Sequence, residues 1–186
     1  MTRRSQSRKG ATPPKGLLSA KAKIKIGTWN VRTLYETGKT AQVAKEMESY
    51  GLDILGLSEV RWLTSGKVKL QSGQTLLYSG HPDEDNIHRD GVGLMMSKKA
   101  TKSLKEWEPV SARIITARFE SKFQKVTIIQ CHAPTNQADQ EDKENFYEEL
   151  QSIVDKTQKR DVTIVMGDMN AKIGSNNQGR EKIMGK

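Results

Sequence analysis

Three apolar segments, widely spaced along the chain, each end abruptly in polar residues. The segments begin near residues 23, 53 and 161, and their polar endings are Thr28-Trp29-Asn30, Ser58-Glu59 and Asp168-Met169-Asn170. Short apolar runs of this kind, bounded by turn residues, are typical of buried strands. Because ligands bind at the carboxyl ends of strands in α/β sheets, the shared ending predicts that these polar groups meet at one mouth.

The remaining patterns predict two amphipathic helices and further strands. Apolar residues at helical spacing predict a helix over residues 40–50, capped at Thr40 and stopped at Gly51, and a second helix over residues 140–158. Four further strands are expected over residues 67–78, 91–97, 112–120 and 125–132. Polar or Gly-rich connections separate them, so we expect a largely antiparallel stretch. The whole pattern is α/β (α+β), with strands outnumbering helices.

The basic charge of the chain is concentrated at its N-terminus. The formal net charge is +9, from 31 basic and 22 acidic residues, and residues 1–25 hold eight of the basic residues and no acidic residue. Few large apolar residues precede Ile24, so residues 1–23 are predicted to form a disordered basic tail. Such a tail binds phosphate backbones nonspecifically, serves as a nuclear address or is a solvated arm, and composition does not distinguish these roles.

Membrane and secretory functions are excluded by the same composition. No apolar run approaches the roughly 18 to 20 residues of a membrane-spanning helix, and no apolar segment follows the charged N-terminus to make a signal peptide. We therefore expect a nuclear or cytoplasmic protein that is not secreted and has no membrane partner. The single cysteine, Cys131, excludes an internal disulfide framework and lies in an apolar run typical of a core position.

Taken singly, the polar strand ends have structural explanations. Glu59 is placed to pair with Arg61, and the Gly-Asp-x-Asn sequence at residues 167–170 favours a turn with local Asx hydrogen bonds. The same oxygen atoms suit Mg²⁺, a hard ion that takes one or two carboxylates and leaves room for water and phosphate oxygens. Both interpretations stay open on these residues alone.

Five motifs, taken in order, resemble a known family. They are Gly27-Thr28-Trp29-Asn30-Val31-Arg32, Leu57-Ser58-Glu59, Gly91-Val92-Gly93, Ala133-Pro134-Thr135-Asn136 and Gly167-Asp168-Met169-Asn170. The set resembles the endonuclease/exonuclease/phosphatase superfamily, and within it the apurinic-endonuclease-like nuclease of RTE-type non-LTR retrotransposons and a domesticated relative. The resemblance implies a two-sheet β-sandwich flanked by helices, with residues 24–186 as the N-terminal portion of the domain.

The resemblance also implies roles for five side chains. Glu59 would be the principal ligand of Mg²⁺, with Mn²⁺ as the alternative ion, and Asn30 would lie beside the metal and the scissile phosphate. Asp168 would orient or activate the attacking water, and Asn170 would support it and contact the phosphate. His132 stands where the family usually has Tyr; it is shorter and titrates near neutrality, yet it can hydrogen-bond a phosphate. No small-molecule cofactor is implied.

Three functions follow from the resemblance. The leading one is a Mg²⁺-dependent phosphodiesterase or endonuclease domain of retrotransposon origin that acts on DNA. The alternatives are a catalytically dead nucleic-acid-binding or interaction module and a phosphatase of the same fold. The family continues to a late Asp and an Asp-His pair, whereas no His follows His132 in this sequence. The resemblance therefore implies a domain truncated at its C-terminus, with impaired activity and an uncovered sheet edge or apolar face.

Overall fold

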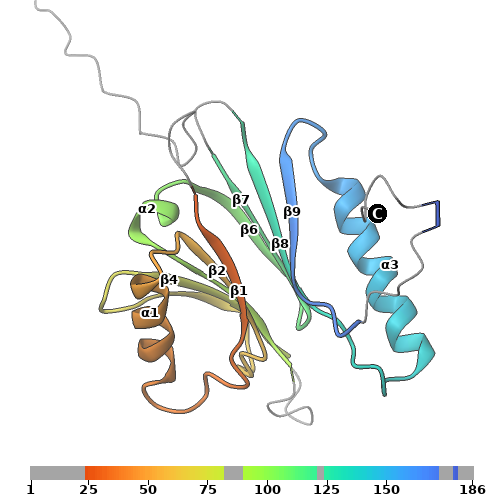
Figure 1. The fold of residues 1–186 in the computed structure, drawn as a ribbon, viewed down its shortest axis with the longest axis horizontal. Coiled ribbons are helices and arrows are strands. Elements are labelled where there is room, and N and C mark those ends of the chain that lie inside the picture. Colours follow the sequence, from red (N-terminus) through yellow and green to blue (C-terminus); the bar gives the residue numbers. More distant parts are fainter. Residues whose placement is uncertain (1–23, 82–89, 121–123, 172–177, 180–186) are drawn as a thin grey trace, which may run out of the picture.

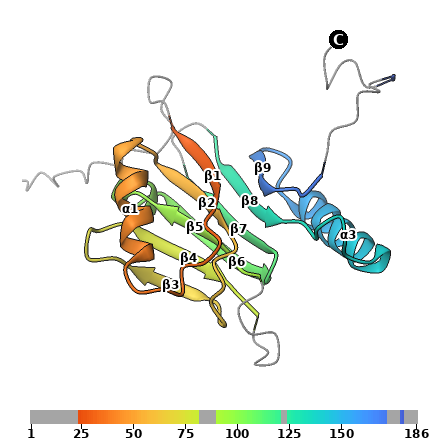
Figure 2. The ribbon, with the colours of Figure 1, turned by 60° about the horizontal axis from the view of Figure 1, so that its bottom comes forward.

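The computed structural model describes residues 24–81, 90–120, 124–171 and 178–179, so the predicted basic tail lies outside the described residues. The described residues form two β-sheets that pack face to face, with a long helix on the outer face of each (Figures 1 and 2). This layering of helix, sheet, sheet and helix confirms the two-sheet sandwich flanked by helices.

The first sheet has the strand order β1-β2-β5-β4-β3. Its strands are β1 (Ile26–Asn30), β2 (Ile54–Ser58), β3 (Gly66–Lys69), β4 (Thr75–Ser79) and β5 (Val92–Met96). Only the β1–β2 pair of this sheet is parallel. Residues 67–78, predicted as one strand, form a hairpin: Gly73, with a φ of 97°, donates its N–H to the carbonyl of Leu70 and closes a turn. Glycine adopts this left-handed conformation without steric cost, which is why the chain reverses there.

The second sheet has the order β6-β7-β8-β9. Its strands are β6 (Leu104–Ser111), β7 (Ile114–Phe119), β8 (Val126–His132) and β9 (Val162–Asp168). The β8–β9 pair is parallel, and the pairs β6–β7 and β7–β8 are antiparallel. β6 escaped the sequence analysis because its charged residues, two register shifts and Pro109 obscure the alternation. Proline is tolerated there because β6 is an edge strand.

The helices are α1 (Lys39–Ser49), the short α2 (Lys98–Thr101) and α3 (Gln140–Lys156). The predicted cap at Thr40 is wrong, because Thr40 lies inside α1 and the N-cap is Gly38 in the left-handed conformation. α3 begins at a side-chain cap, where Asp139 accepts the N–H of Asp142 at 2.8 Å. In the described part of the chain, no helix has the length and apolarity needed to cross a membrane.

Three apolar clusters hold the layers together. The largest lies between the sheets and includes Ile54, Leu94, Ile115, Phe119 and Ile128, all 1% exposed or less. The second packs α1 against the outer face of the first sheet, and the third packs α3 against the outer face of the second. Burial of these side chains is the main force that fixes how the two sheets face each other. The geometry of any site that spans the sheets depends on this central layer.

Among the described residues, β1 and β9 leave one side of the sandwich with exposed apolar side chains. β1 and β9 are end strands of their sheets and lie next to each other (Figure 1). Three large apolar side chains of these two strands are substantially exposed: Trp29 at 45%, Val162 at 39% and Val165 at 38%.

Candidate functional site

The candidate site forms where the carboxyl ends of β1, β2, β8 and β9 meet. Asn30 ends β1, Glu59 directly follows β2, His132 ends β8 and Asp168 ends β9. The parallel pairs β1–β2 and β8–β9 place these ends at one edge of the sandwich, with His132 opposite Asp168 in register. Asn170 follows two residues later. The structure thus brings together all five predicted site residues, whose catalytic roles stay predictions.

Asn30 connects the two carboxylates of the site. Its Nδ2 donates to Oε1 of Glu59 at 2.7 Å and to Oδ2 of Asp168 at 3.2 Å. Its Oδ1 accepts the backbone N–H of Arg32 at 3.0 Å, which fixes the orientation of the amide. Asn30 therefore holds an acidic side chain of the first sheet beside one of the second.

Glu59 is held from both sides. One carboxylate oxygen accepts from Asn30, and Nη2 of Arg61 donates to the other, Oε2, at 2.8 Å. Burial acts to raise the pKa of this carboxyl, but the hydrogen bonds from Asn30 and Arg61 and the charges of Arg61 and His132 outweigh it. The pKa of Glu59 consequently lies below its ordinary value of 4.5. The side chain is therefore an anion at neutral pH. The ion pair with Arg61 that the sequence suggested does form, and it forms inside the candidate site.

Asp168 is oriented by the turn that follows it. The N–H of Asn170 donates to Oδ1 of Asp168 at 3.1 Å, which is the Asx hydrogen bond expected of this sequence. Nδ2 of Asn170 donates to the carbonyl of Ala133 at 2.7 Å, and the N–H of Ala133 donates to the carbonyl of Asp168 at 2.9 Å. The turn and the site are therefore one structure, in which local hydrogen bonds hold the Asp168 carboxylate against Asn30.

His132 lies beneath the carboxylates and is only 6% exposed. Its Nδ1 is buried and has no hydrogen-bond partner among the described residues. Burial and the charge of Arg113 lower the pKa of His132 below its ordinary value, against the opposing charges of Asp90, Asp168 and Glu59. The imidazole is therefore neutral at physiological pH and offers one donor and one acceptor.

Backbone strain is concentrated at this site. Among the described residues, the non-glycine residues with positive φ are Arg32 (61°), Glu59 (59°), Arg61 (60°) and Asn170 (45°). Each is a predicted site residue or lies two positions from one. Such conformations cost of order 1–3 kcal/mol and persist where the surroundings impose them, most often at functional sites. The strain therefore supports a functional interpretation of these loops.

Gly91 gives the Gly91-Val92-Gly93 motif a physical role. Its carbonyl accepts the N–H of Val60 at 2.9 Å, and its φ is 112°. A Cβ at this position would lie 2.9 Å from the backbone nitrogen of Arg61, too close for any side chain. Glycine is required because the start of β5 pins the strained turn that presents Glu59.

A buried polar pair beneath the site was not found from the sequence. Nε2 of Gln130 donates to Oγ of Ser58 at 3.1 Å, and both residues are 0% exposed. The pair joins β2 to β8 through the apolar layer between the sheets, one residue before Glu59 and two before His132. A Gln in a short apolar run was the only available signal, and it became informative only once its partner, 72 positions away, was known.

The donor atoms suit a hard divalent cation bound partly by other ligands. Within the described ranges, no group of three or more His, Cys, Asp or Glu side chains is arranged to hold a metal ion. Glu59 and Asp168 nevertheless supply two carboxylates joined through Asn30, and Mg²⁺ requires only one or two when water and phosphate oxygens complete its shell. Asn30 presents Nδ2 to the carboxylates, so its oxygen would bind a cation only after rotation of the amide.

An open cleft of about 800 Å³ lies beside these groups. It is lined by the ends of β1 and β9 and by the loop after β8, and Asn30, Asp168 and Asn170 border it. Glu59 and His132 are not part of its lining. The cleft is large enough for a phosphate and the groups attached to it.

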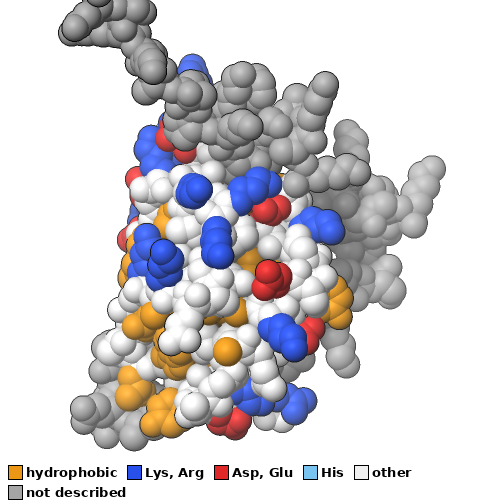
Figure 3. Space-filling model, turned by 90° about the vertical axis from the view of Figure 1, so that its left-hand side faces the viewer, with side chains coloured by type: hydrophobic (Ala, Val, Ile, Leu, Met, Phe, Trp, Pro, Cys, Tyr) orange, Lys and Arg blue, Asp and Glu red, His pale blue; other side chains and the backbone are white. Residues whose placement is uncertain are grey.

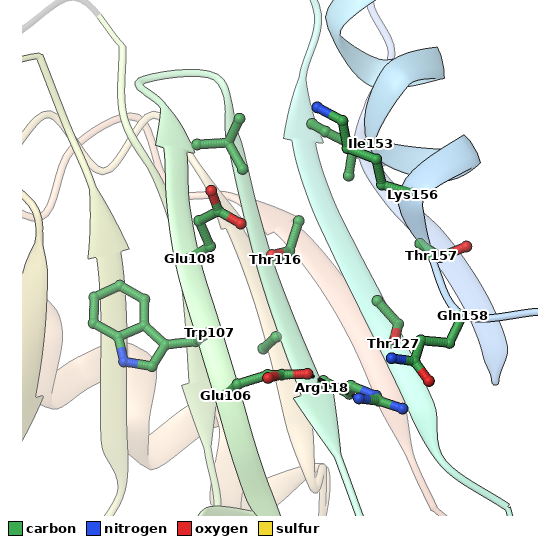
Figure 4. Close-up of a pocket in the computed structure, with 12 residues that line it drawn as sticks. Glu106, Trp107, Glu108, Thr116, Arg118, Thr127, Ile153, Lys156, Thr157 and Gln158 are labelled. Atoms are coloured by element: carbon green, nitrogen blue, oxygen red, sulfur yellow. Dashed lines mark hydrogen bonds and ion pairs between the residues drawn. The ribbon is translucent and has the colours of Figure 1, made fainter.

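A second hollow, of about 450 Å³, lies away from this site between the outer face of the second sheet and the end of α3 (Figure 4). Arg118 in its wall bonds Asp161 through Nε and Nη2 and Glu106 through Nη1. These bonds to Arg118 lower the pKa of Asp161 despite its burial. The cluster is an internally compensated ion network, and we assign it a structural role.

The chain matches a family model described as the Endonuclease/Exonuclease/phosphatase family over residues 27–179. Craniofacial development protein 2 from Bos taurus is 38% identical over 150 residues, which cover 81% of this chain and 24% of that protein. The chain therefore spans about a quarter of the length of the curated relatives that it matches.

Solved structures share the fold. An AP endonuclease from Archaeoglobus fulgidus superposes with a TM-score of 0.62 at 18% identity, covering 82% of this chain and 60% of that one. The endonuclease domain of TRAS1, a telomere-specific non-LTR retrotransposon, gives a TM-score of 0.57 at 16% identity, covering 81% of this chain and 61% of that one.

Proposed function

Since the chain belongs to the endonuclease/exonuclease/phosphatase family, we propose that it is the core of a metal-dependent phosphodiesterase that acts on DNA. One observation carries the proposal: Asn30 joins the carboxylates of Glu59 and Asp168 across the two sheets, beside an open cleft. Two anions held together in this way provide a place for a divalent cation and for the proton of an attacking water.

The contacts of each side chain suggest its role in the proposed reaction. Glu59, with Asn30 beside it, would hold Mg²⁺ or Mn²⁺, which when bound offsets the charge that develops on phosphoryl oxygens. Asp168 would accept the proton of the water, since Asn30 and the N–H of Asn170 fix its carboxylate at the cleft. The amide of Asn170 would contact the phosphate. His132 would hydrogen-bond a phosphate oxygen as a neutral imidazole.

DNA is favoured as the substrate by the names of the similar proteins. The fold is shared with an AP endonuclease and with a retrotransposon endonuclease domain. A phosphatase of the same fold would act on phosphomonoesters and is distinguished by assay. The proposal extends to the origin of the chain, which we assign to a retrotransposon nuclease of the RTE type.

The second candidate is a nucleic-acid-binding module without catalysis, and Arg61 is the observation that favours it. Its guanidinium bonds Oε2 of Glu59 and competes with any cation for that oxygen. We therefore expect the 186-residue chain to hydrolyse DNA slowly. The two candidates differ in whether cleavage, however slow, depends on the metal and on Asp168.

The test uses the purified chain with supercoiled plasmid, a duplex containing an abasic site, and a chromogenic phosphomonoester. Each is incubated with Mg²⁺, with Mn²⁺ and with EDTA. Metal-dependent nicking of either DNA, without release of phosphate from the monoester, supports the nuclease. Hydrolysis of the monoester alone supports the phosphatase. Binding of DNA with no hydrolysis of any substrate supports the module.

A further inference from the structure

Trp29 occupies an unusual position for a large apolar residue. It is 45% exposed and precedes Asn30, the residue that joins the two carboxylates of the candidate site. The residue lines both the cleft that contains Asp168 and a second hollow of about 370 Å³ against α1. Trp29 and Asn30 therefore line both hollows.

The other two tryptophans pack against neighbouring residues of the fold. Trp62 packs edge to face against Tyr78, with ring centroids 4.6 Å apart, and Trp107 packs against the central apolar layer. Trp29 belongs to none of the apolar clusters of the described residues. Its indole therefore has a surface that the described fold does not use.

The hollow against α1 carries cations next to Trp29. Arg32 and Lys39 line it together with Gln42 and one acidic residue, Glu46. Arg32 has a positive φ, and its N–H donates to Oδ1 of Asn30. Its guanidinium makes no hydrogen bond or ion pair with another residue in the described part of the chain. Lys39 makes only a loose, exposed contact with Glu36 at 3.7 Å. An aromatic ring beside two exposed cations is the composition of single-strand nucleic-acid grooves.

The wider surface has the matching charge. Figure 3 shows the face that carries α1 and α2, where Lys and Arg side chains are spread widely and Asp and Glu are fewer. Exposed lysines lie on three of the described elements: Lys45 on α1, Lys67 and Lys69 on β3, and Lys98 and Lys99 on α2. A polyanion that leaves the hollow would meet these lysines together with the exposed Glu46 and Glu48 of α1.

We propose that Trp29 stacks on an unpaired nucleobase next to the scissile phosphate, while Arg32 and Lys39 contact the phosphate that follows. This inference rests on the proposed function, because Asn30 and Asp168 place the scissile phosphate. It names the substrate class more narrowly: DNA that is single-stranded or locally unstacked at this nucleotide. A base inside an intact duplex has its faces covered by its neighbours and cannot offer one to the indole.

The test measures binding of a labelled single-stranded oligonucleotide by anisotropy in EDTA, so the result does not depend on hydrolysis. Trp29→Ala is expected to weaken binding roughly 5- to 150-fold, equivalent to about 1–3 kcal/mol per stacked base. Trp29→Phe keeps an aromatic face and should stay within about threefold of wild type. The matched control is Tyr147→Ala, which removes an aromatic residue of similar exposure, 47%, from α3.

A second arm keeps the inference falsifiable if Trp29→Ala fails to fold. An abasic spacer is moved along the oligonucleotide. At one position, the spacer should weaken binding to wild type by a larger factor than it weakens binding to Trp29→Phe. Arg32→Gln should reduce the slope of log affinity against log salt by about one. Equal binding by Trp29→Ala and Tyr147→Ala, no sensitive spacer position, or a wild-type dimer that Trp29→Ala dissociates would overturn the inference. If binding does not depend on Trp29 but metal-dependent cleavage is intact, this inference fails and the proposed function stands.

Discussion

Nδ2 of Asn30 lies 3.2 Å from Oδ2 of Asp168, although the two residues are 138 positions apart. The bond joins the end strand of one sheet to the end strand of the other. Because the same nitrogen also donates to Glu59, a single amide sets the separation of the two carboxylates. The separation of the two carboxylates therefore depends on how the sheets pack.

Asn30→Ala removes both donors and leaves Glu59 facing Asp168 without a bridge. Hydrogen bonds to charged groups contribute about 1.5–3 kcal/mol, so the free energy of unfolding in EDTA should fall by about that amount. Urea denaturation measures it, with Asn145→Ala on the exposed face of α3 as control. Equal stability of the two variants in EDTA would show that the bridge is unimportant.

The buried pair between Ser58 and Gln130 should behave as a unit. Ser58→Ala or Gln130→Met alone leaves a buried polar partner unsatisfied and should cost about 1–3 kcal/mol of unfolding free energy. The double variant, with two apolar side chains, should be more stable than the sum of the single losses predicts. A double-mutant cycle in urea measures this coupling. Simple additivity would contradict a direct interaction.

Arg61→Gln should strengthen binding of Mn²⁺, because it removes the cation that competes for Oε2 of Glu59. Arg61 is 37% exposed on its side chain, so the pair is solvent-screened and the gain should be modest, roughly two- to fivefold in affinity. The pKa of Glu59 should rise at the same time, since Arg61 lowers it. Calorimetric titration provides the affinity, with Lys45→Gln as control. Weaker binding of Mn²⁺ would mean that Arg61 organises the site for the metal.

His132 should make the fold sensitive to mild acid. Its pKa is lowered on folding, so the unfolded chain binds the proton first as the pH falls below the ordinary value of 6.5. The stabilisation from the neutral imidazole is complete above that value and is lost as the pH falls toward the folded pKa. Glu59 and Asp161, whose pKa values are also lowered, lose their contribution in a separate window, below 4.5 and 3.8 respectively. Urea denaturation at pH 7 and pH 5.5 should show a drop for wild type that His132→Gln reduces.

The sequence predicted those strands whose own residues form an apolar run with a polar end. The apolar runs that end at Asn30, Glu59 and Asp168 predicted β1, β2 and β9, and the parallel pairs confirm that these ends share an edge. The family pattern named five side chains, and the structure places all five near that edge, while their roles stay predictions. Local patterns were sufficient because burial and polarity change sharply at the ends of these strands.

Contacts between distant segments were not predictable in the same way. The partner of Gln130 became known only from the sheet packing, and the positive φ of Arg61 has no signature in its residue type. Gly73 broke an apparent strand into a hairpin because one left-handed residue is enough to reverse the chain. These features depend on tertiary context, which one sequence does not contain.

The most direct measurement of the central claim is the rate at which Asp168→Asn nicks supercoiled plasmid in Mg²⁺. The substitution keeps the shape of the side chain but removes the proton acceptor, and general-base catalysis contributes typically 10²–10⁴-fold, so the rate should fall by about that factor. Asp155→Asn, an exposed position on α3, is the control and should nick at the wild-type rate. Anisotropy should show that all three proteins bind DNA alike. A rate for Asp168→Asn equal to that of Asp155→Asn would contradict the assignment of this cleft as the site of hydrolysis.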